Sequence, residues 1–192
     1  MAARKGGKPN KEDDRAFLER VVGEYYRKVN DAIKRHDPNH LFIGSRFHGQ
    51  ALASPALFRG AGKYADVISV NYYHRWTPEN DRISGWAKLA GKPILISEWY
   101  AMAGDAGVPN STGSGWLVRT QADRAQFYQH FTLSLLGNPG CVGWHWFKYR
   151  DSDTNNPGVV SRTFEPYALL LQAMREVNRQ VYALADFMRK QS

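Results

Sequence analysis

The sequence predicts an α/β fold, in which helices alternate with parallel strands and together form half of a (β/α)8 barrel. Segments with helical periodicity alternate with short apolar runs along the chain. These runs do not alternate between polar and apolar residues, which is typical of strands covered on both faces. Residues with chemical functions recur where the runs end. At 192 residues, the chain is shorter than the roughly 250 residues of a full barrel.

Five helices are predicted from apolar periodicity and capping signals. In the first, apolar residues such as Leu18, Val22 and Tyr25 recur three and four positions apart. Ser54-Pro55 supplies a cap and a first-turn proline for the second, and Thr120 to Asp123 resembles a capping box. The predicted helices cover 14–35, 54–63, 82–90, 120–136 and 165–190.

Four apolar runs are predicted to be buried strands, at 41–46, 67–72, 93–98 and 141–147. Arg46, Tyr72 and Glu98 end the first three and lie 26 residues apart each time, and Trp146 lies near the end of the fourth. An open doubly wound sheet is the alternative, but no glycine-rich nucleotide-binding sequence follows any of these strands. A constant unit length with functional residues at strand ends favours the barrel.

The composition is that of a soluble globular protein, with 43% hydrophobic and 23% charged residues. Residues 1–10 are polar and basic and predict no signal peptide in this chain. We expect residues 1–13 to form a basic flexible tail and 14–192 to form the half-barrel domain. Because the net charge is +8, a polyanion-binding α/β domain is an alternative function.

No cofactor and no metal site are predicted. The single cysteine, Cys141, excludes an internal disulfide and a cysteine-based zinc site. Asp151 and Asp153 have the spacing of calcium ligands, but the rest of an EF-hand loop is missing, so we interpret them as solvated loop acids.

Glu98 is the candidate catalytic residue. It ends the apolar run 93–98, where burying a carboxylate is costly unless the group has a partner or a function. A glutamate in such a place can attack an anomeric carbon as the nucleophile of a retaining glycoside hydrolase, while a second carboxyl group protonates the leaving oxygen. The alternative is a structural glutamate paired with Arg46 or His48.

Substrate-binding residues are predicted at the same strand ends. Tyr72 matches the position of Glu98 on the preceding strand, so we expect its hydroxyl, rather than that of Tyr73, to donate to Glu98. The indole of Trp146 is a candidate platform for a pyranose ring. Charged side chains of the first strand can bind hydroxyl or sulfate oxygens. The predicted substrate-binding set is Arg46, His48, Asn71, Tyr72, Trp99 and Trp146.

Four stretches of the sequence resemble strands five to eight of clan A glycoside hydrolases. They read DPNHLFIGSRF at 37–47, YADVISVNYY at 64–73, KPILISEW at 92–99 and VGWHWFKY at 142–149. Within that clan the chain is most similar to agarase-like enzymes of families 50 and 86, which act on red-algal galactans. The resemblance covers about residues 15 to 185 and implies the carboxyl-terminal half of a (β/α)8 barrel.

The resemblance also implies roles for individual residues. Glu98 corresponds to the retaining nucleophile, Tyr72 to the strand-six tyrosine near it, and Trp146 to the strand-eight aromatic at the cleaved sugar. The acid/base glutamate of the clan ends strand four, which this chain lacks. We therefore expect an agarase- or galactanase-like hydrolase that carries the nucleophile but not the acid/base. A non-catalytic carbohydrate-binding half barrel is the alternative.

The expected partner is a polysaccharide or oligosaccharide, neutral or anionic. Because open sheet edges tend to pair, a missing amino-terminal half barrel or a second copy of the chain is expected to complete the fold. No membrane or nucleic-acid partner is expected. The long segment 101–119 is predicted to be an irregular loop that forms part of the substrate cleft or a lid over it.

Overall fold

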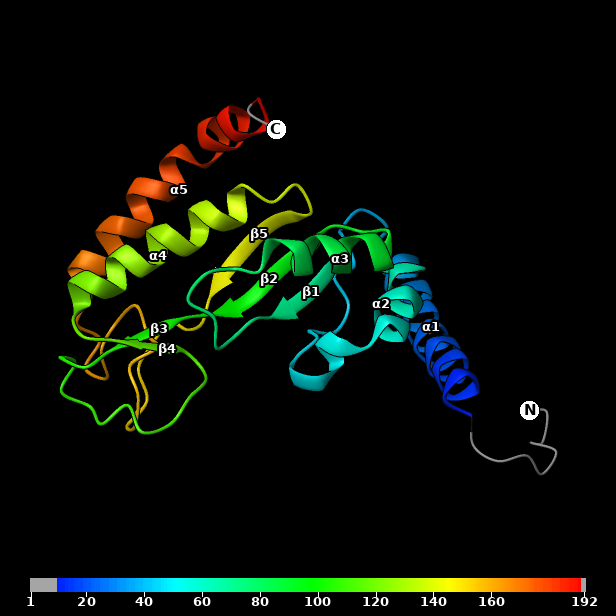
Figure 1. Cartoon of the computed structure of the whole chain (residues 1–192), viewed down its shortest axis with the longest axis horizontal. Helices are drawn as coiled ribbons and strands as arrows, with labels where there is room; N and C mark the ends of the chain where they lie inside the picture. The colour runs from blue at the N-terminus through cyan, green and yellow to red at the C-terminus, as the bar shows by residue number, and fades with distance from the viewer. Residues whose placement is uncertain (1–9, 191–192) are drawn as a thin grey trace.

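A computed structural model describes residues 10–190 and shows an α/β fold built on a parallel sheet (Figure 1). The sheet contains β1 (Ile68–Asn71), β2 (Ile94–Trp99) and β5 (Cys141–Trp146), in the order β1-β2-β5. Both strand pairs are parallel, so their carboxyl ends lie at one edge of the sheet. The predicted α/β class with a parallel sheet is confirmed.

The helices lie close to their predicted positions. They are α1 (Lys11–His36), α2 (Pro55–Gly62), α3 (Asn80–Ala90), α4 (Gln121–Leu136) and α5 (Ala168–Arg189). The capping box of α4 is present, because the Thr120 hydroxyl accepts from the backbone N–H of Asp123, and the Asp123 carboxylate accepts from that of Thr120. Helix α1 packs on α2 and helix α4 on α5, at opposite ends of the molecule (Figure 1).

Helix α1 begins inside the segment that was predicted to be a tail. Its first residue is Lys11, and the side chain of Asn10 caps it by accepting a hydrogen bond from the backbone N–H of Glu12 at 3.0 Å. Residues 1–9 of the predicted tail lie outside the described part of the chain. The division into a tail and a half-barrel domain stays a prediction.

The predicted strand at 41–46 is wrong, because this segment is not a regular strand. Gly44 adopts a left-handed conformation with φ of +63°, and the Tyr26 ring lies where a Cβ atom would stand. The backbone returns to β1 only at Phe47, which forms a single parallel bridge with Val70. Around this bridge, Phe47 N–H donates to the Ser69 carbonyl at 2.8 Å.

The segment 101–119, predicted to be irregular, contains a second, small parallel sheet. It consists of β3 (Ala101–Ala103) and β4 (Trp116–Val118). All three residues of β3 are buried, which explains why this stretch is ordered. The small sheet and the loop after β5 gather beyond the carboxyl ends of the main strands (Figure 1).

The core lies between the main sheet and the helices. Its fully buried members include Phe58, Ile68, Val70, Ile83, Ile94, Ile96, Phe131 and Leu135, none more than 1% exposed. Burial of each such side chain stabilises the fold by about 1.5–3 kcal/mol. Together these contacts hold β1 and β2, and therefore the site at their ends, in position. No helix among residues 10–190 is long and apolar enough to cross a membrane.

Candidate active site

Glu98 lies at the carboxyl end of β2 with 15% of its side chain exposed. One carboxylate oxygen forms an ion pair with the guanidinium of Arg46, and the other accepts a hydrogen bond from the hydroxyl of Tyr73. Two donors from different segments thus fix the orientation of the carboxylate. The ion pair between Glu98 and Arg46, predicted as the structural alternative, is present. The catalytic role of Glu98 stays a prediction.

Tyr73 is a permanent hydrogen-bond donor to this carboxylate. Burial first, and then the adjacent Glu98 carboxylate, raise the pKa of its hydroxyl well above the ordinary value. The phenol therefore keeps its proton at neutral pH. The ring is held edge-on by the rings of His48 and Tyr100, each with its centroid 5.6 Å away.

The predicted contact between Tyr72 and Glu98 is wrong. The pairing of β1 with β2 shifts by one residue after Val70, so that Asn71 pairs with Glu98. This irregularity places Tyr72 on the same side of the sheet as Trp99, next to the helices. Tyr72 is 2% exposed, and its hydroxyl donates to the carboxylate of Glu79 at 2.7 Å. Tyr73, which was not expected to contact Glu98, donates the hydrogen bond that was predicted for Tyr72.

Trp99 was predicted to bind substrate, but it belongs to the core. Its ring is 1% exposed and stacks on Phe131 with centroids 4.2 Å apart. A sugar therefore cannot reach this indole. Asn71 lies at the sheet edge, where its side-chain oxygen accepts a hydrogen bond from the Ser97 hydroxyl at 2.9 Å.

Trp146 is partly exposed at the carboxyl end of β5, beside β2. Its indole N–H donates to the Pro157 carbonyl at 2.7 Å, and its ring meets that of Trp99 at 77°. Arg46 and His48 are exposed at the end of β1 that carries the site. The strand ends thus bring together Arg46, His48, Asn71, Tyr73 and Glu98. The predicted grouping of Trp146 with Glu98 is wrong, because Trp146 pairs with Trp99 and its ring packs on the helix side against Trp99, Tyr128 and Arg124.

The sequence analysis missed Arg124, a buried side chain of α4 that holds two segments next to the carboxyl edge of the sheet. Although it is 0% exposed, it has carbonyl acceptors: Nε donates to Ala101 at 2.8 Å and Nη2 to Gly158 at 2.6 Å. Its guanidinium lies 5.4 Å from the centre of the Trp146 ring. Burial lowers its pKa to about 10, so it stays charged. An arginine in the apolar stripe of α4 is the sequence signal that could have revealed it.

Asp151 accompanies Arg124 and corrects another expectation. It was interpreted as a solvated loop acid, but it is 3% exposed. Its carboxylate accepts hydrogen bonds from the Gly158 N–H at 2.7 Å and from the Tyr167 hydroxyl at 2.5 Å. Asp151 therefore holds the loop after β5 in shape. Among residues 10–190, no group of three or more His, Cys, Asp or Glu is arranged to hold a metal ion.

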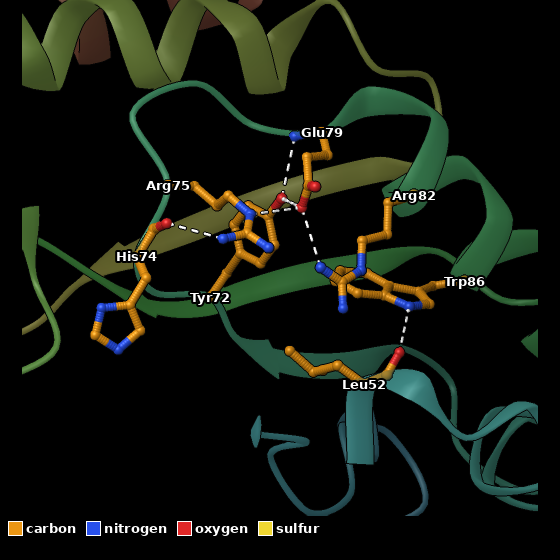
Figure 2. Close-up of polar contacts among 7 residues, drawn as sticks. All are labelled: Leu52, Tyr72, His74, Arg75, Glu79, Arg82 and Trp86. Carbon is orange, nitrogen blue, oxygen red and sulfur yellow. Dashed lines mark hydrogen bonds and ion pairs between the residues drawn. The ribbon is translucent and has the colours of Figure 1, made fainter. Parts of the chain in front are cut away.

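A second polar cluster closes the loop that follows β1 (Figure 2). The carboxylate of Glu79 accepts hydrogen bonds from Tyr72 at 2.7 Å, Arg75 at 2.8 Å and Arg82 at 3.1 Å. The Tyr72 hydroxyl also accepts from the backbone N–H of Glu79 at 3.1 Å. Because these bonds join both ends of residues 72–79, the loop is a compact, closed unit. His74 contributes only its backbone carbonyl, which accepts a hydrogen bond from Arg75, and the His74 ring points away from the cluster.

This cluster predicts a pH-dependent contribution to stability. Hydrogen bonding to Arg75, followed by the bonds to Tyr72 and Arg82, lowers the pKa of Glu79 from 4.5 to about 2. A lowered pKa means that the stabilisation is complete above about pH 4.5 and is lost as the pH falls toward 2. We expect Glu79→Gln to lower the melting temperature by a few degrees at pH 6 and to leave it almost unchanged near pH 2. A difference that does not depend on pH would contradict this.

No protein-family profile matches the chain, but individual proteins do. Beta-agarase B of Vibrio sp. strain JT0107 is 34% identical over 185 residues, which cover 91% of this chain and 19% of the agarase. Beta-agarase A of the same strain is 34% identical over 188 residues, which cover 89% of this chain and 18% of that agarase. Among solved structures, BpGH50 is 38% identical with a TM-score of 0.87, covering 94% of this chain and 40% of BpGH50. This chain is therefore an agarase-like segment, similar to part of BpGH50 and to part of each Vibrio agarase.

The agarase-like segment spans less than half the length of these relatives, about a fifth in the two Vibrio agarases. A solved exo-beta-agarase gives the same result, with 31% identity, a TM-score of 0.82, and coverage of 94% of this chain and 25% of that one. The predicted agarase resemblance is therefore confirmed. The predicted partial barrel is confirmed as a TIM-barrel-like part of GH50 structures.

Proposed function

We propose that the agarase-like segment forms the nucleophile side of a retaining glycoside hydrolase site that acts on a galactan. The single observation that carries the proposal is the Glu98 carboxylate, which two donors hold at the carboxyl edge of a parallel sheet. In (β/α)8 enzymes this edge carries the active site. The agarase relatives supply the substrate class.

In the proposed reaction, a carboxylate oxygen of Glu98 attacks the anomeric carbon. The bond to the leaving oxygen breaks, that oxygen takes a proton from an acid, and a glycosyl ester of Glu98 forms. Water then cleaves the ester, with the conjugate base of the acid accepting its proton. Arg46 and Tyr73 orient the attacking carboxylate, whereas His48 and Asn71 bind the sugar.

The acid/base carboxyl comes, in this proposal, from outside the segment. We assign the segment to strands five to eight of the barrel, and the acid/base to the end of strand four. Retention requires the two carboxyl groups to lie about 5–5.5 Å apart across the mouth of one barrel. The amino-terminal (β/α) units of such a barrel are therefore the proposed partner of this chain.

Within residues 10–190, β5 is an edge strand of the main sheet, and this open edge supports that partner. A groove of about 800 Å³ runs between β5 and α5, and Val142 in it is 59% exposed. In a closed barrel each strand has a neighbour on both sides, so a strand placed against β5 would cover this groove. The matched part of BpGH50, at 40% of that chain, leaves ample sequence for such units.

The test is a chimera in which this chain replaces the matching part of beta-agarase B. We expect the chimera to release oligosaccharides from agarose and its Glu98→Gln variant to release almost none. The non-catalytic alternative, which is based on the limited coverage of the relatives, predicts agarose binding by both proteins and hydrolysis by neither. Equal hydrolysis by both proteins would remove Glu98 from the proposed role.

Tyr73→Phe is expected to slow the chimera by about 10- to 100-fold in kcat, because it removes one hydrogen bond to a charged group, worth about 1.5–3 kcal/mol. The measurement is kcat on a soluble agarose oligosaccharide. Tyr25→Phe is the matched control, since that hydroxyl lies on α1 and has only a 3.4 Å contact with Ser45. Equal kcat values for Tyr73→Phe and the parent chimera would contradict the role of Tyr73.

A further inference from the structure

Two tryptophans are exposed beside a pocket that is separate from Glu98. Trp76 is 45% exposed and Trp116 is 40% exposed, and their ring centroids lie 6.0 Å apart at an interplanar angle of 65°. The adjoining pocket has a volume of about 480 Å³ between the loop after β1, β4 and the first half of α4. Its lining residues are Trp76, Leu117, Val118, Arg119, Asp123, Gln126, Phe127 and His130.

The fold holds the Trp76 ring in one orientation. The ring meets Phe127 edge-on, with centroids 5.2 Å apart, and stacks against His130 at 6.1 Å. The neighbouring Thr77 hydroxyl lies 2.8 Å from Nε2 of His130, which ties the loop to α4. The Glu79 cluster closes the same loop at its base (Figure 2). A ligand that binds here does not have to order the indole, so its affinity is not reduced by that cost.

The polar groups around the indoles favour an uncharged ligand. The guanidinium of Arg119 lies 3.4 Å from the carboxylate of Asp123, so these two charges offset each other at the rim. The exposed amide of Gln126 offers both a donor and an acceptor. Exposed aromatic faces next to a few hydrogen-bonding groups suit a molecule that has an apolar face and hydroxyl edges.

We propose that this pocket, the Trp76–Trp116 site, binds a neutral pyranose unit of a polysaccharide at a distance from the catalytic centre. The choice of a galactan as the polysaccharide rests on the proposed function. The Trp76–Trp116 site lies at the same edge of the fold as Glu98, because Trp76 follows the carboxyl end of β1 and Trp116 follows that of β2. A hydrogen bond from His74 N–H to the Ser114 carbonyl joins the two segments that carry the indoles. A second contact with one polymer raises its effective concentration at the first.

The test measures binding of neoagarohexaose, a neutral agarose oligosaccharide, to the isolated chain by titration calorimetry. Trp76→Ala and Trp116→Ala are each expected to weaken binding about tenfold, the loss expected for one aromatic contact. Gln126→Ala is expected to weaken it several-fold by loss of a hydrogen bond. Tyr182→Ala is the matched control, since it removes an aromatic side chain that is 86% exposed on α5. Circular dichroism checks the fold, and Trp116→Ala and Gln126→Ala keep the test valid if Trp76→Ala unfolds.

Three results would overturn the proposal. The first is parent-like affinity in both tryptophan variants. The second is equal or tighter binding of a sulfated carrageenan oligosaccharide, because the Trp76–Trp116 site would then not select a neutral sugar. The third is an effect of the tryptophan variants on self-association in sedimentation, without sugar binding, which would identify a second copy as the occupant. Failure of the proposed function would instead appear as hydrolysis by the chimera that does not depend on Glu98.

Discussion

Glu98→Ala in the chimeric agarase is expected to lower kcat on agarose by about 10³- to 10⁶-fold, as the loss of a covalent nucleophile does in other enzymes. The expectation follows from the position of the carboxylate, which is 15% exposed and held by Arg46 and Tyr73. Those two donors remain in the variant, so the site keeps its donors but loses the attacking atom and the negative charge that pairs with Arg46. Agarose binding should therefore change far less than kcat.

A small anion distinguishes a missing nucleophile from a damaged site. In Glu98→Ala, azide can enter the space of the carboxylate and attack the anomeric carbon of an aryl galactoside, whose phenolate leaves. The product is then a galactosyl azide of inverted configuration, and the rate rises with azide concentration. Absence of rescue, together with a kcat close to that of the parent chimera, would contradict the nucleophile assignment.

Arg124→Met is expected to produce the largest loss of stability. The variant leaves the carbonyls of Ala101 and Gly158 without their buried donors, and it removes the positive charge that faces Asp151. Breaking a buried charged network costs about 3–5 kcal/mol. For a chain of this size, that corresponds to a melting temperature about 6–20 °C lower. Differential scanning calorimetry of the isolated chain measures it.

The matched control is Arg189→Met, which removes an exposed arginine whose ion pair with Asp186 lies on the surface of α5. Such pairs contribute about 0–1 kcal/mol, so the control should melt close to the parent. Arg124→Lys should fall between the two, because lysine keeps the charge but cannot reach two carbonyls with one planar fork. A melting temperature of Arg124→Met equal to that of Arg189→Met would show that the network does not support the fold.

The helices could be predicted because their signals are local. The apolar spacing of α1 and the Thr120 capping box both lie within a few residues of the structure they specify. The strand at 41–46 failed because Gly44 turns the backbone out of an otherwise apolar run. Residues 101–103 form β3 by pairing with β4, and Arg124, 21 or more positions later, also donates to this segment. Such long-range contacts leave no periodic pattern in the sequence.

For the site, the 26-residue spacing correctly brought Arg46 and Glu98 to one edge of the sheet. It failed for Tyr72, because it assumes an unbroken register and the pairing shifts by one residue after Val70. The extra residue is Ser97 in β2, so Glu98 turns to the face that carries Asn71 and Tyr73, while Tyr72 stays on the buried face of Ile68 and Val70. Local pattern also could not show that Trp76 stays exposed, since its surroundings come from β4 and α4.

Covalent labelling tests the central claim most directly. A 2-deoxy-2-fluoro-galactoside with a dinitrophenolate leaving group needs no acid catalyst for the first step, and the fluorine slows hydrolysis of the glycosyl ester. After incubation with the chimera, peptide mass spectrometry should find the fluorogalactosyl group on Glu98, and the Glu98→Gln variant should stay unlabelled. A label on another residue, or equal labelling of the variant, would contradict the account.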